Sequence, residues 1–260
     1  MTLTGRTVVV TRPEAQSVEL VGRLRSLGAW PLIAPAIRIL PPDDAALDQA
    51  VDGLLHGRFR WLVLTSANGV RALFERLAER GLRSPSELTA PIAAIGPGTR
   101  AALAGVGAEP ALVPERYTTE ALGEAMPRGS GEVLLARADI AEPGLEDALR
   151  AKGWTPVRVD AYRTEPVGGL PAELTDALDA GTVDAVTFTS ASIVRGFLQA
   201  LGPDGSDLFA KPARPLVVCI GPVTSDAAKQ VGLPVDAVAE PHTIDGLVEA
   251  LERILGGSAG

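Results

Sequence analysis

The sequence has few of the residues that build metal sites and disulfides. It contains one cysteine, Cys219, which lies inside an apolar run, and two histidines, His56 and His242, which are far apart in the chain. A single cysteine cannot form a disulfide within the chain, and this fits a reducing compartment. Structural zinc usually takes four ligands of these residue types. We therefore expect no metal site, and we expect both histidines to be surface or loop residues.

Aromatic residues are scarce, and acidic residues outnumber basic ones. Phe, Trp and Tyr make up 4% of the chain, and 32 acidic against 24 basic residues give a net charge of −8. Proteins that bind single-stranded nucleic acid stack the bases on aromatic rings. A negative net charge also disfavours attraction to nucleic acid or anionic lipid. We therefore expect no nucleic-acid or membrane partner, whereas a small anionic ligand stays compatible because local backbone dipoles can attract it.

Long apolar runs are absent as well. No segment approaches the roughly 18 consecutive apolar residues of a transmembrane helix, and the first residues, "MTLTGRTVVVTRPEA", lack the pattern of a signal peptide. These absences lead us to expect a soluble cytoplasmic protein. Hydrophobic residues nevertheless make up 46% of the 260 residues, which is enough for the cores of two domains.

Short apolar segments alternate with helical patterns along the chain. Several segments are apolar at every position, as in strands of a parallel sheet that helices cover on both faces. One helical pattern, Ser17–Gly28, has an apolar stripe that includes Val18 and Leu27, and its glycine is placed to end the helix. The alternation predicts α/β layers. The candidate strands are Thr7–Thr11, Trp30–Pro35, Trp61–Ser66, Ile92–Gly96, Glu132–Arg137, Thr155–Tyr162, Asp184–Ser190 and Leu216–Gly221.

Five blocks of sequence occur twice, in the same order, at an offset of 124 to 125 residues. "TSANGV" (Thr65–Val70) matches "TSASIV" (Thr189–Val194), and "IGPGT" (Ile95–Thr99) matches "IGPVT" (Ile220–Thr224). This offset is far longer than the period of a solenoid, so it indicates a twofold duplication. Two similar domains generally leave a cleft, and parallel strands tend to bind ligands at their carboxyl ends. We therefore expect the paired corners to face a ligand cleft.

Small polar residues follow two of the matching strands and precede helices. Ser66 and Asn68 stand in the first copy, and Ser190 and Ser192 stand in the second. Such side chains cap helices by accepting a hydrogen bond from a free backbone N–H. A helix N-terminus also carries about half a positive charge, so the same corners could bind an anionic group. The residues alone leave both roles open.

The Gly-Pro corners form a second pair. Gly96 and Gly221 are expected to permit a tight turn and the close approach of a ligand. The prolines that follow them suit the first turn of a helix, and Thr99 and Thr224 would then offer hydroxyl groups there. Neither corner has the lysine of a phosphate-binding loop or the three glycines of a dinucleotide turn. As nucleotide-binding signals, both corners are therefore weak.

Two arginines and one tyrosine complete the candidate set. Arg12 and Arg137 match each other in the duplication and follow apolar strands, where each could form a salt bridge or contact a ligand carboxylate. Tyr162 lies in the extended run "VDAYRTEP" (Val159–Pro166). A tyrosine there could pack against the domain or could donate a proton to a leaving group.

As a set, these motifs resemble those of the uroporphyrinogen-III synthase family. The match runs from about Val8 to Leu251, which is nearly the whole chain. No single motif is specific, but their order, doubling and spacing are. The resembling motifs are "VVVTRP", "TSANGV" with "FTSASIV", "IGPGTRAAL" with "IGPVTSDAA", "VDAYRTEP" and "AEPHTIDGLVEAL".

The resemblance implies two similar doubly wound parallel-sheet domains of flavodoxin-like type, joined by two extended linkers, with the ligand cleft between them. It also implies that the domains are not the two halves of the sequence. Residues 1–36 and 166–260 would form one discontinuous domain, and residues 41–160 would form the other. The linkers would lie at about 36–41 and 160–166.

The implied reaction is the cyclisation of hydroxymethylbilane, a linear tetrapyrrole with eight carboxylates, to uroporphyrinogen III. Water is lost and the last ring is inverted, on the route to haem, sirohaem and cobalamin, and no cofactor or metal is expected. Tyr162 corresponds to the family's recurring tyrosine and would assist departure of the hydroxyl. We also expect a monomer that makes transient contact with hydroxymethylbilane synthase. The expected substrate-binding residues are Arg12, Ser66, Asn68, Gly96, Thr99, Arg137, Ser190, Ser192, Gly221 and Thr224.

Two alternatives stay open at this point. One is a non-catalytic, two-lobed cytoplasmic protein that binds a small molecule. The other is a nucleotide- or sugar-using transferase built from two doubly wound domains, against which the weak nucleotide signals count.

Overall fold

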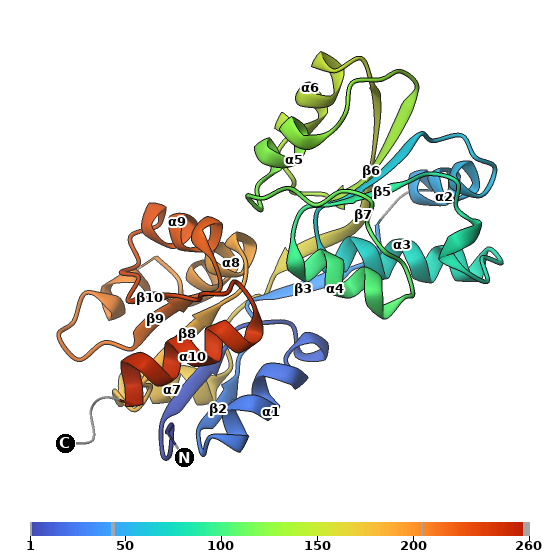
Figure 1. The fold of residues 1–260 in the computed structure, drawn as a ribbon. Coiled ribbons are helices and arrows are strands. Elements are labelled where there is room, and N and C mark those ends of the chain that lie inside the picture. The colour runs from blue at the N-terminus through green and yellow to red at the C-terminus, as the bar shows by residue number, and fades with distance from the viewer. Residues whose placement is uncertain (1, 43–44, 204, 257–260) are drawn as a thin grey trace. The chain divides into compact units, whose positions relative to one another are not determined.

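The computed structural model describes residues 2–42, 45–203 and 205–256 and divides into two compact units (Figure 1). Unit 1 comprises Met1–Arg38 together with Glu165–Gly260, and unit 2 comprises Ile39–Thr164. Unit 1 is therefore discontinuous in sequence. The two unit boundaries fall inside the segments that were expected to be linkers.

Unit 1 contains a five-stranded sheet in the order β10-β9-β8-β1-β2, and all of its neighbouring strands are parallel. Its strands are β1 (Thr7–Val10), β2 (Trp30–Ile33), β8 (Ala185–Phe188), β9 (Leu216–Cys219) and β10 (Ala237–Val238). Four of them match candidate strands. The fifth, β10, was not predicted, because two residues are too short to produce a hydrophobic pattern.

Helices cover both faces of this sheet. Apolar side chains of α1 and α10 pack against one face in a single cluster with β1, β8 and β9. On the other face, Phe188 of β8 packs edge-on against Phe197 of α8, with ring centroids 5.3 Å apart. The helical segments of unit 1 are η1 (Glu14–Gln16), α1 (Val18–Ser26), α7 (Ala172–Asp179), α8 (Ala191–Leu201), η3 (Gly205–Phe209), α9 (Pro222–Gln230) and α10 (Ile244–Leu255).

The helix expected over Ser17–Gly28 forms as α1, with one difference. Gly28 follows it with φ +85°, a left-handed conformation that favours glycine, so the predicted helix end is confirmed. Leu20 and Leu24 are buried in the expected stripe. Val18, however, is 75% exposed, because it is the first residue of the helix and lies beyond the edge of the packed face.

Unit 2 contains a second five-stranded sheet, in the order β3-β7-β6-β4-β5. The pairs β4–β5, β4–β6 and β6–β7 are parallel. The strands are β3 (Ile37–Leu40), β4 (Trp61–Leu64), β5 (Ile92–Ala94), β6 (Glu132–Ala138) and β7 (Thr155–Pro166). Apolar side chains from both faces of these strands are buried, in two separate clusters.

The two clusters show which helices cover which face of the second sheet. Side chains of α2, α3 and α4 lie in the cluster with Leu62 and Leu64, and those of α5 and α6 lie in the cluster with Val63. This doubly covered parallel sheet confirms the predicted α/β class. The helical segments are α2 (Ala46–Leu55), α3 (Ala67–Glu79), η2 (Pro85–Glu87), α4 (Pro97–Gly105), α5 (Thr119–Ala125) and α6 (Gly144–Ala151).

The two segments that cross the unit boundaries are strands. β3 and β7 are hydrogen-bonded neighbours in the sheet, and β7 continues to Pro166, four residues beyond the expected end at Tyr162. Pairing with β3 gives the last residues of β7 a partner for their backbone groups, which a sequence pattern cannot reveal.

Candidate functional site

Tyr162 lies at the carboxyl end of the β6–β7 pair in unit 2. The pairing of these strands shifts by one residue there: Arg137 is opposite Asp160, whereas Ala138 is opposite Tyr162. An extra residue of this kind is a β-bulge, which redirects the side chains that follow it. The Tyr162 side chain is 8% exposed and packs in the apolar cluster of α2, α3 and α4.

The Tyr162 hydroxyl donates a hydrogen bond to the Oγ of Ser66 at 3.0 Å. Ser66 is the N-cap residue of α3, and its Oγ also accepts a hydrogen bond from the backbone N–H of Gly69 at 3.0 Å. The predicted capping role of Ser66 is confirmed. The structure thus brings two candidate residues from distant parts of the sequence into direct contact.

Two further residues of α3 face the same phenol. Asn68 is within hydrogen-bonding reach of Tyr162, and Arg71 donates a hydrogen bond to the Asn68 Oδ1. Burial raises the pKa of Tyr162, and the negative charge of Asp139 raises it further, while Ser66, Asn68 and Arg71 act in the opposite direction. The net shift is upward, so the phenol is protonated at neutral pH.

Asp139 was not singled out from the sequence. Its backbone N–H donates to the Tyr162 carbonyl at 3.2 Å, and its Oδ1 accepts from the Thr164 N–H at 3.0 Å. It therefore holds the backbone on both sides of Arg163. The signal that could have identified it is its position directly after a buried strand, where side chains reach the carboxyl edge of the sheet.

Arg137 forms a buried ion pair with Glu146 of α6. Its Nη1 lies 2.9 Å from the Glu146 Oε2 and 2.8 Å from the Glu142 carbonyl oxygen, and the two side chains are 4% and 6% exposed. A salt bridge was the structural alternative to ligand binding at this position. Because both side chains are buried, little of this guanidinium is exposed to a ligand carboxylate.

Arg158 completes the support of the loop that follows β6. Its guanidinium donates to the carbonyl oxygens of Ala138, Asp139 and Ala141, at 3.2, 2.8 and 2.8 Å. Neither Arg158 nor Glu146 could be recognised from the sequence, because their partners lie on other elements. The two arginines together satisfy the carbonyl groups of a loop that has no regular structure.

The Gly-Pro corner of unit 2 starts α4 as predicted, with Gly96 at the N-cap and the proline in the first turn. The tight turn expected at this glycine is wrong, however, whereas the expected approach of a ligand stays a prediction. The Gly96 φ of 179° is extended backbone that any residue adopts. Instead, a Cβ added at Gly96 would lie 3.0 Å from the Tyr117 side chain, so close packing requires the glycine. Thr99 is 4% exposed and faces the interior.

The matching corners of unit 1 have the same local structure. Ser190 caps α8 by accepting from the Ile193 N–H at 3.3 Å, and its Oγ lies 2.9 Å from the Oγ of Ser192. Gly221 is the N-cap of α9, again with extended backbone, so the tight turn expected there is also corrected. Thr224 is 4% exposed, like its counterpart Thr99.

Arg12 is the second residue after β1, and Ser190 is the second residue after the neighbouring strand β8. The side chain of Arg12 is half-buried, and the Arg12 carbonyl oxygen accepts a hydrogen bond from the Ser17 Oγ at 3.2 Å. Because the strands are parallel, the candidate residues of unit 1 share the carboxyl edge of its sheet.

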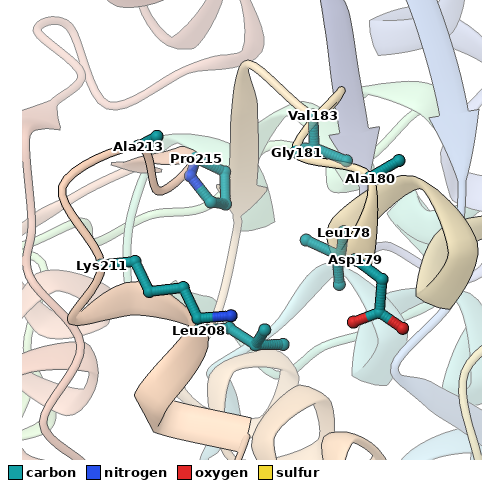
Figure 2. Close-up of a pocket in the computed structure, with 9 residues that line it drawn as sticks. All are labelled: Leu178, Asp179, Ala180, Gly181, Val183, Leu208, Lys211, Ala213 and Pro215. Atoms are coloured by element: carbon teal, nitrogen blue, oxygen red, sulfur yellow. The ribbon is translucent and has the colours of Figure 1, made fainter.

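Each unit contains a cavity. The cavity in Figure 2, of about 190 Å³, is in unit 1 and is lined by Leu178, Asp179, Val183, Lys211 and Pro215 among others. Val183 and Pro215 precede β8 and β9, so this cavity is at the amino edge of the sheet. A cavity of about 310 Å³ in unit 2 is lined by residues of α3, including Arg71, by residues of the segment after α3, and by Val106 after α4.

Among residues 2–42, 45–203 and 205–256, no helix is long and apolar enough to cross a membrane. The same residues contain no group of three or more His, Cys, Asp and Glu side chains that could hold a metal ion.

Comparisons with known proteins agree on one family. A family model described as uroporphyrinogen-III synthase HemD matches residues 18–249. The chain is 31% identical to the uroporphyrinogen-III synthase of Synechococcus elongatus, over 96% of both proteins. The chain is 34% identical to the porphyrin biosynthesis protein HemD of Ruminiclostridium josui. That alignment covers 98% of this chain and 50% of the Ruminiclostridium protein.

Solved structures give the same result. A mutant uroporphyrinogen III synthase from Thermus thermophilus aligns with a TM-score of 0.72 at 25% identity, covering 97% of this chain and all of that one. The wild-type Thermus protein aligns with a TM-score of 0.56 at 26% identity, covering 98% of this chain and all of that one. The chain therefore belongs to the uroporphyrinogen-III synthase family.

Proposed function

We propose that this chain cyclises hydroxymethylbilane to uroporphyrinogen III and that the carboxyl edge of unit 2 around Tyr162 removes the substrate hydroxyl. The observation that carries the assignment of this edge is the hydrogen bond from the buried Tyr162 phenol to Ser66, at the N-terminus of α3. A phenol that stays protonated can assist the departure of a hydroxyl group as water.

Loss of the hydroxyl converts the end of the linear tetrapyrrole into a cationic azafulvene. Attack at the substituted carbon of the last ring then gives a spiro intermediate, from which the ring is re-formed in inverted orientation. Without an enzyme, hydroxymethylbilane closes into a ring without inversion of the last pyrrole. Much of the catalytic effect is therefore an effect of orientation, because the protein must prevent the wrong carbon from closing the ring first.

The substrate carries eight carboxylates, whereas the chain has a net charge of −8. We propose that helix N-termini resolve this conflict, because their free N–H groups and positive dipole ends bind anions without basic side chains. Arg12 would assist in unit 1. Arg137 is assigned a structural role instead, because Glu146 already pairs with it. The proposed binding residues are Arg12, Ser66, Asn68, Gly96, Ser190, Ser192 and Gly221.

Thr99 and Thr224 are proposed to act mainly through their backbone N–H groups. Both side chains are 4% exposed, which leaves little surface for a ligand to touch. We further propose that the protein acts as a cytoplasmic monomer and that it meets hydroxymethylbilane synthase transiently. The single buried cysteine supports a reducing compartment.

The test supplies hydroxymethylbilane, generated in situ by its own synthase, and separates the type I and type III products. We expect type III product to form in proportion to the amount of this protein. Type I product alone, at high protein concentration, would reject the proposal in favour of a non-catalytic binding protein. A binding protein of that kind would still quench the intrinsic fluorescence or shift the melting temperature when the bilane is added.

A further inference from the structure

We propose that the Ser66 hydroxyl, and not the Tyr162 phenol, donates the proton to the departing hydroxyl, while Tyr162 resupplies that proton to Ser66. This inference rests on the proposed function and identifies the side chain that protonates the oxygen of the departing hydroxyl. The direction of the hydrogen bonds around α3 and the burial of the phenol support this assignment.

The proton of Tyr162 already has an acceptor. The phenol donates to the Ser66 Oγ at 3.0 Å, and the side chain is 8% exposed. Arg71 donates to the Asn68 Oδ1, which leaves the Asn68 amide nitrogen to donate to the phenol oxygen within its reach. The phenol therefore passes its proton towards Ser66 and has little surface to offer a substrate.

Ser66, in contrast, has one donor left. A hydroxyl group has two acceptor sites and one donor. The Ser66 Oγ accepts from the Gly69 N–H at 3.0 Å and from Tyr162 at 3.0 Å, so both acceptor sites are used. Its own O–H must then point elsewhere, and the half-buried side chain lies nearer the solvent than the phenol does. Hydrogen bonds that form a chain polarise one another, so accepting a hydrogen bond from Tyr162 makes the Ser66 hydroxyl a stronger donor.

The proposed step balances. The Ser66 O–H bond breaks and its proton bonds to the leaving hydroxyl oxygen, while the C–O bond breaks with its electron pair on oxygen, so water departs. The Tyr162 proton moves to the Ser66 Oγ, and the resulting phenolate lies beside the Asn68 amide and near the Arg71 charge. After the spiro intermediate opens, the unsubstituted carbon of the inverted ring closes the macrocycle and loses its proton as the pyrrole is re-formed, and this proton returns through Ser66 to the phenolate.

The duplication provides an internal comparison. Ser190 is the counterpart of Ser66 and caps α8 in the same way, but its Oγ pairs with the Oγ of Ser192 at 2.9 Å. An offset of 125 residues places Ile37 where unit 2 has Tyr162. Both units therefore have a serine that caps the helix after the strand. In unit 2 a tyrosine donates a hydrogen bond to that serine, whereas the matching position of unit 1 is Ile37.

The experiment compares four variants with the full chain in the coupled assay. Ser66→Gly removes the hydroxyl but retains a residue that is accepted at N-caps. Ser66→Thr retains both the hydroxyl and the cap. Tyr162→Phe removes the phenol hydroxyl that returns a proton to Ser66. The double variant, Ser66→Gly with Tyr162→Phe, removes both hydroxyl groups. Ser84→Gly is the matched control, because Ser84 caps η2 next to the opposite, amino edge of the same sheet.

We expect Ser66→Gly to lower kcat about a hundredfold, within the range of general acid catalysis, with a much smaller effect on KM than on kcat. Ser66→Thr should recover kcat to within about tenfold of the unaltered chain. The double variant should be no slower than Ser66→Gly, because Tyr162 acts only through Ser66. Ser84→Gly should retain full activity.

Two results would overturn this inference. One is a Ser66→Gly kcat within about threefold of the unaltered chain while Tyr162→Phe is slower. The other is a double variant that is slower than Ser66→Gly by the full factor of Tyr162→Phe, since independent contributions multiply. Either result leaves the type III product of the unaltered chain intact, so it is distinct from failure of the proposed function. Circular dichroism of each variant separates loss of the donor from loss of folding.

Discussion

The phenol of Tyr162 and the hydroxyl of Ser66 lie 3.0 Å apart, although 96 residues separate them in the sequence. Tyr162 comes from the last part of β7, and Ser66 comes from the corner between β4 and α3. The pairing order of the sheet and a bulge opposite Arg137 and Ala138 bring the two side chains together. The first predictions concern this contact.

Tyr162→Phe should slow the formation of type III product at least about tenfold, which corresponds to about 1.4 kcal/mol. The change removes one oxygen atom and retains the ring that packs in the core. Initial rates in the coupled assay measure the effect. Tyr117→Phe is the control, because Tyr117 is the other tyrosine of the chain and is 43% exposed. Equal rates for the two variants would remove Tyr162 from the mechanism.

The Tyr162 phenol should ionise above the ordinary tyrosine pKa of about 10, since burial and Asp139 raise its pKa. Ultraviolet titration of the Tyr117→Phe variant reports Tyr162 as the single tyrosine. Asp139→Asn should lower the midpoint of that titration, because it removes the negative charge. The folded state holds this proton more tightly than the unfolded state, so Tyr162 stabilises the fold below about pH 10. That contribution is lost as the pH rises through the folded-state pKa.

Arg137 and Glu146 should matter for stability. Glu146→Ala leaves the Arg137 charge buried without its carboxylate, and we expect the free energy of unfolding to fall by about 3–5 kcal/mol. Urea denaturation measures this change. Asp147→Ala is the control on the same helix, because its pair with Arg150 is exposed and should contribute no more than about 1 kcal/mol. A loss of less than that for Glu146→Ala would contradict the structural role.

Arg12 should instead affect binding of the substrate. If its half-buried side chain contacts a carboxylate, Arg12→Met should raise KM about tenfold or more, since hydrogen bonds to charged groups contribute about 1.5–3 kcal/mol. We expect kcat to change less, because Arg12 is proposed to bind a substrate carboxylate and not to transfer a proton. An unchanged KM in the coupled assay would take Arg12 out of the binding set.

Gly196 should be intolerant of a side chain. A Cβ at this position of α8 would lie 2.6 Å from the Ala36 carbonyl oxygen and 2.7 Å from the Ile37 side chain. Gly196→Ala should therefore destabilise unit 1 by about 1–3 kcal/mol through overpacking. Gly22→Ala in α1 is the matched control, because nothing lies within 4 Å of that position. It should raise the melting temperature, since alanine favours a helix by roughly 1 kcal/mol.

The local features of the chain could be predicted because they depend on residues that are close in sequence. Ser66 and Ser190 both cap the helices that follow them. Each cap is a bond between a side chain and an N–H three residues later, so the pattern of neighbours is sufficient to predict it. The apolar strands and the helix end at Gly28 were predictable for the same reason.

The sequence by itself determined the α/β class, the twofold duplication and the family, because periodicity, repeated blocks and motif order are properties of the chain. The tertiary structure alone decided which candidates share a site. In the fold, Tyr162 donates a hydrogen bond to Ser66, and Arg137 forms an ion pair with Glu146. Asp139 and Arg158 bind backbone groups near this contact, although neither stood out in the sequence. These contacts depend on strand order and on a one-residue register shift. Such long-range pairing is set by the packing of whole elements, which no local pattern encodes.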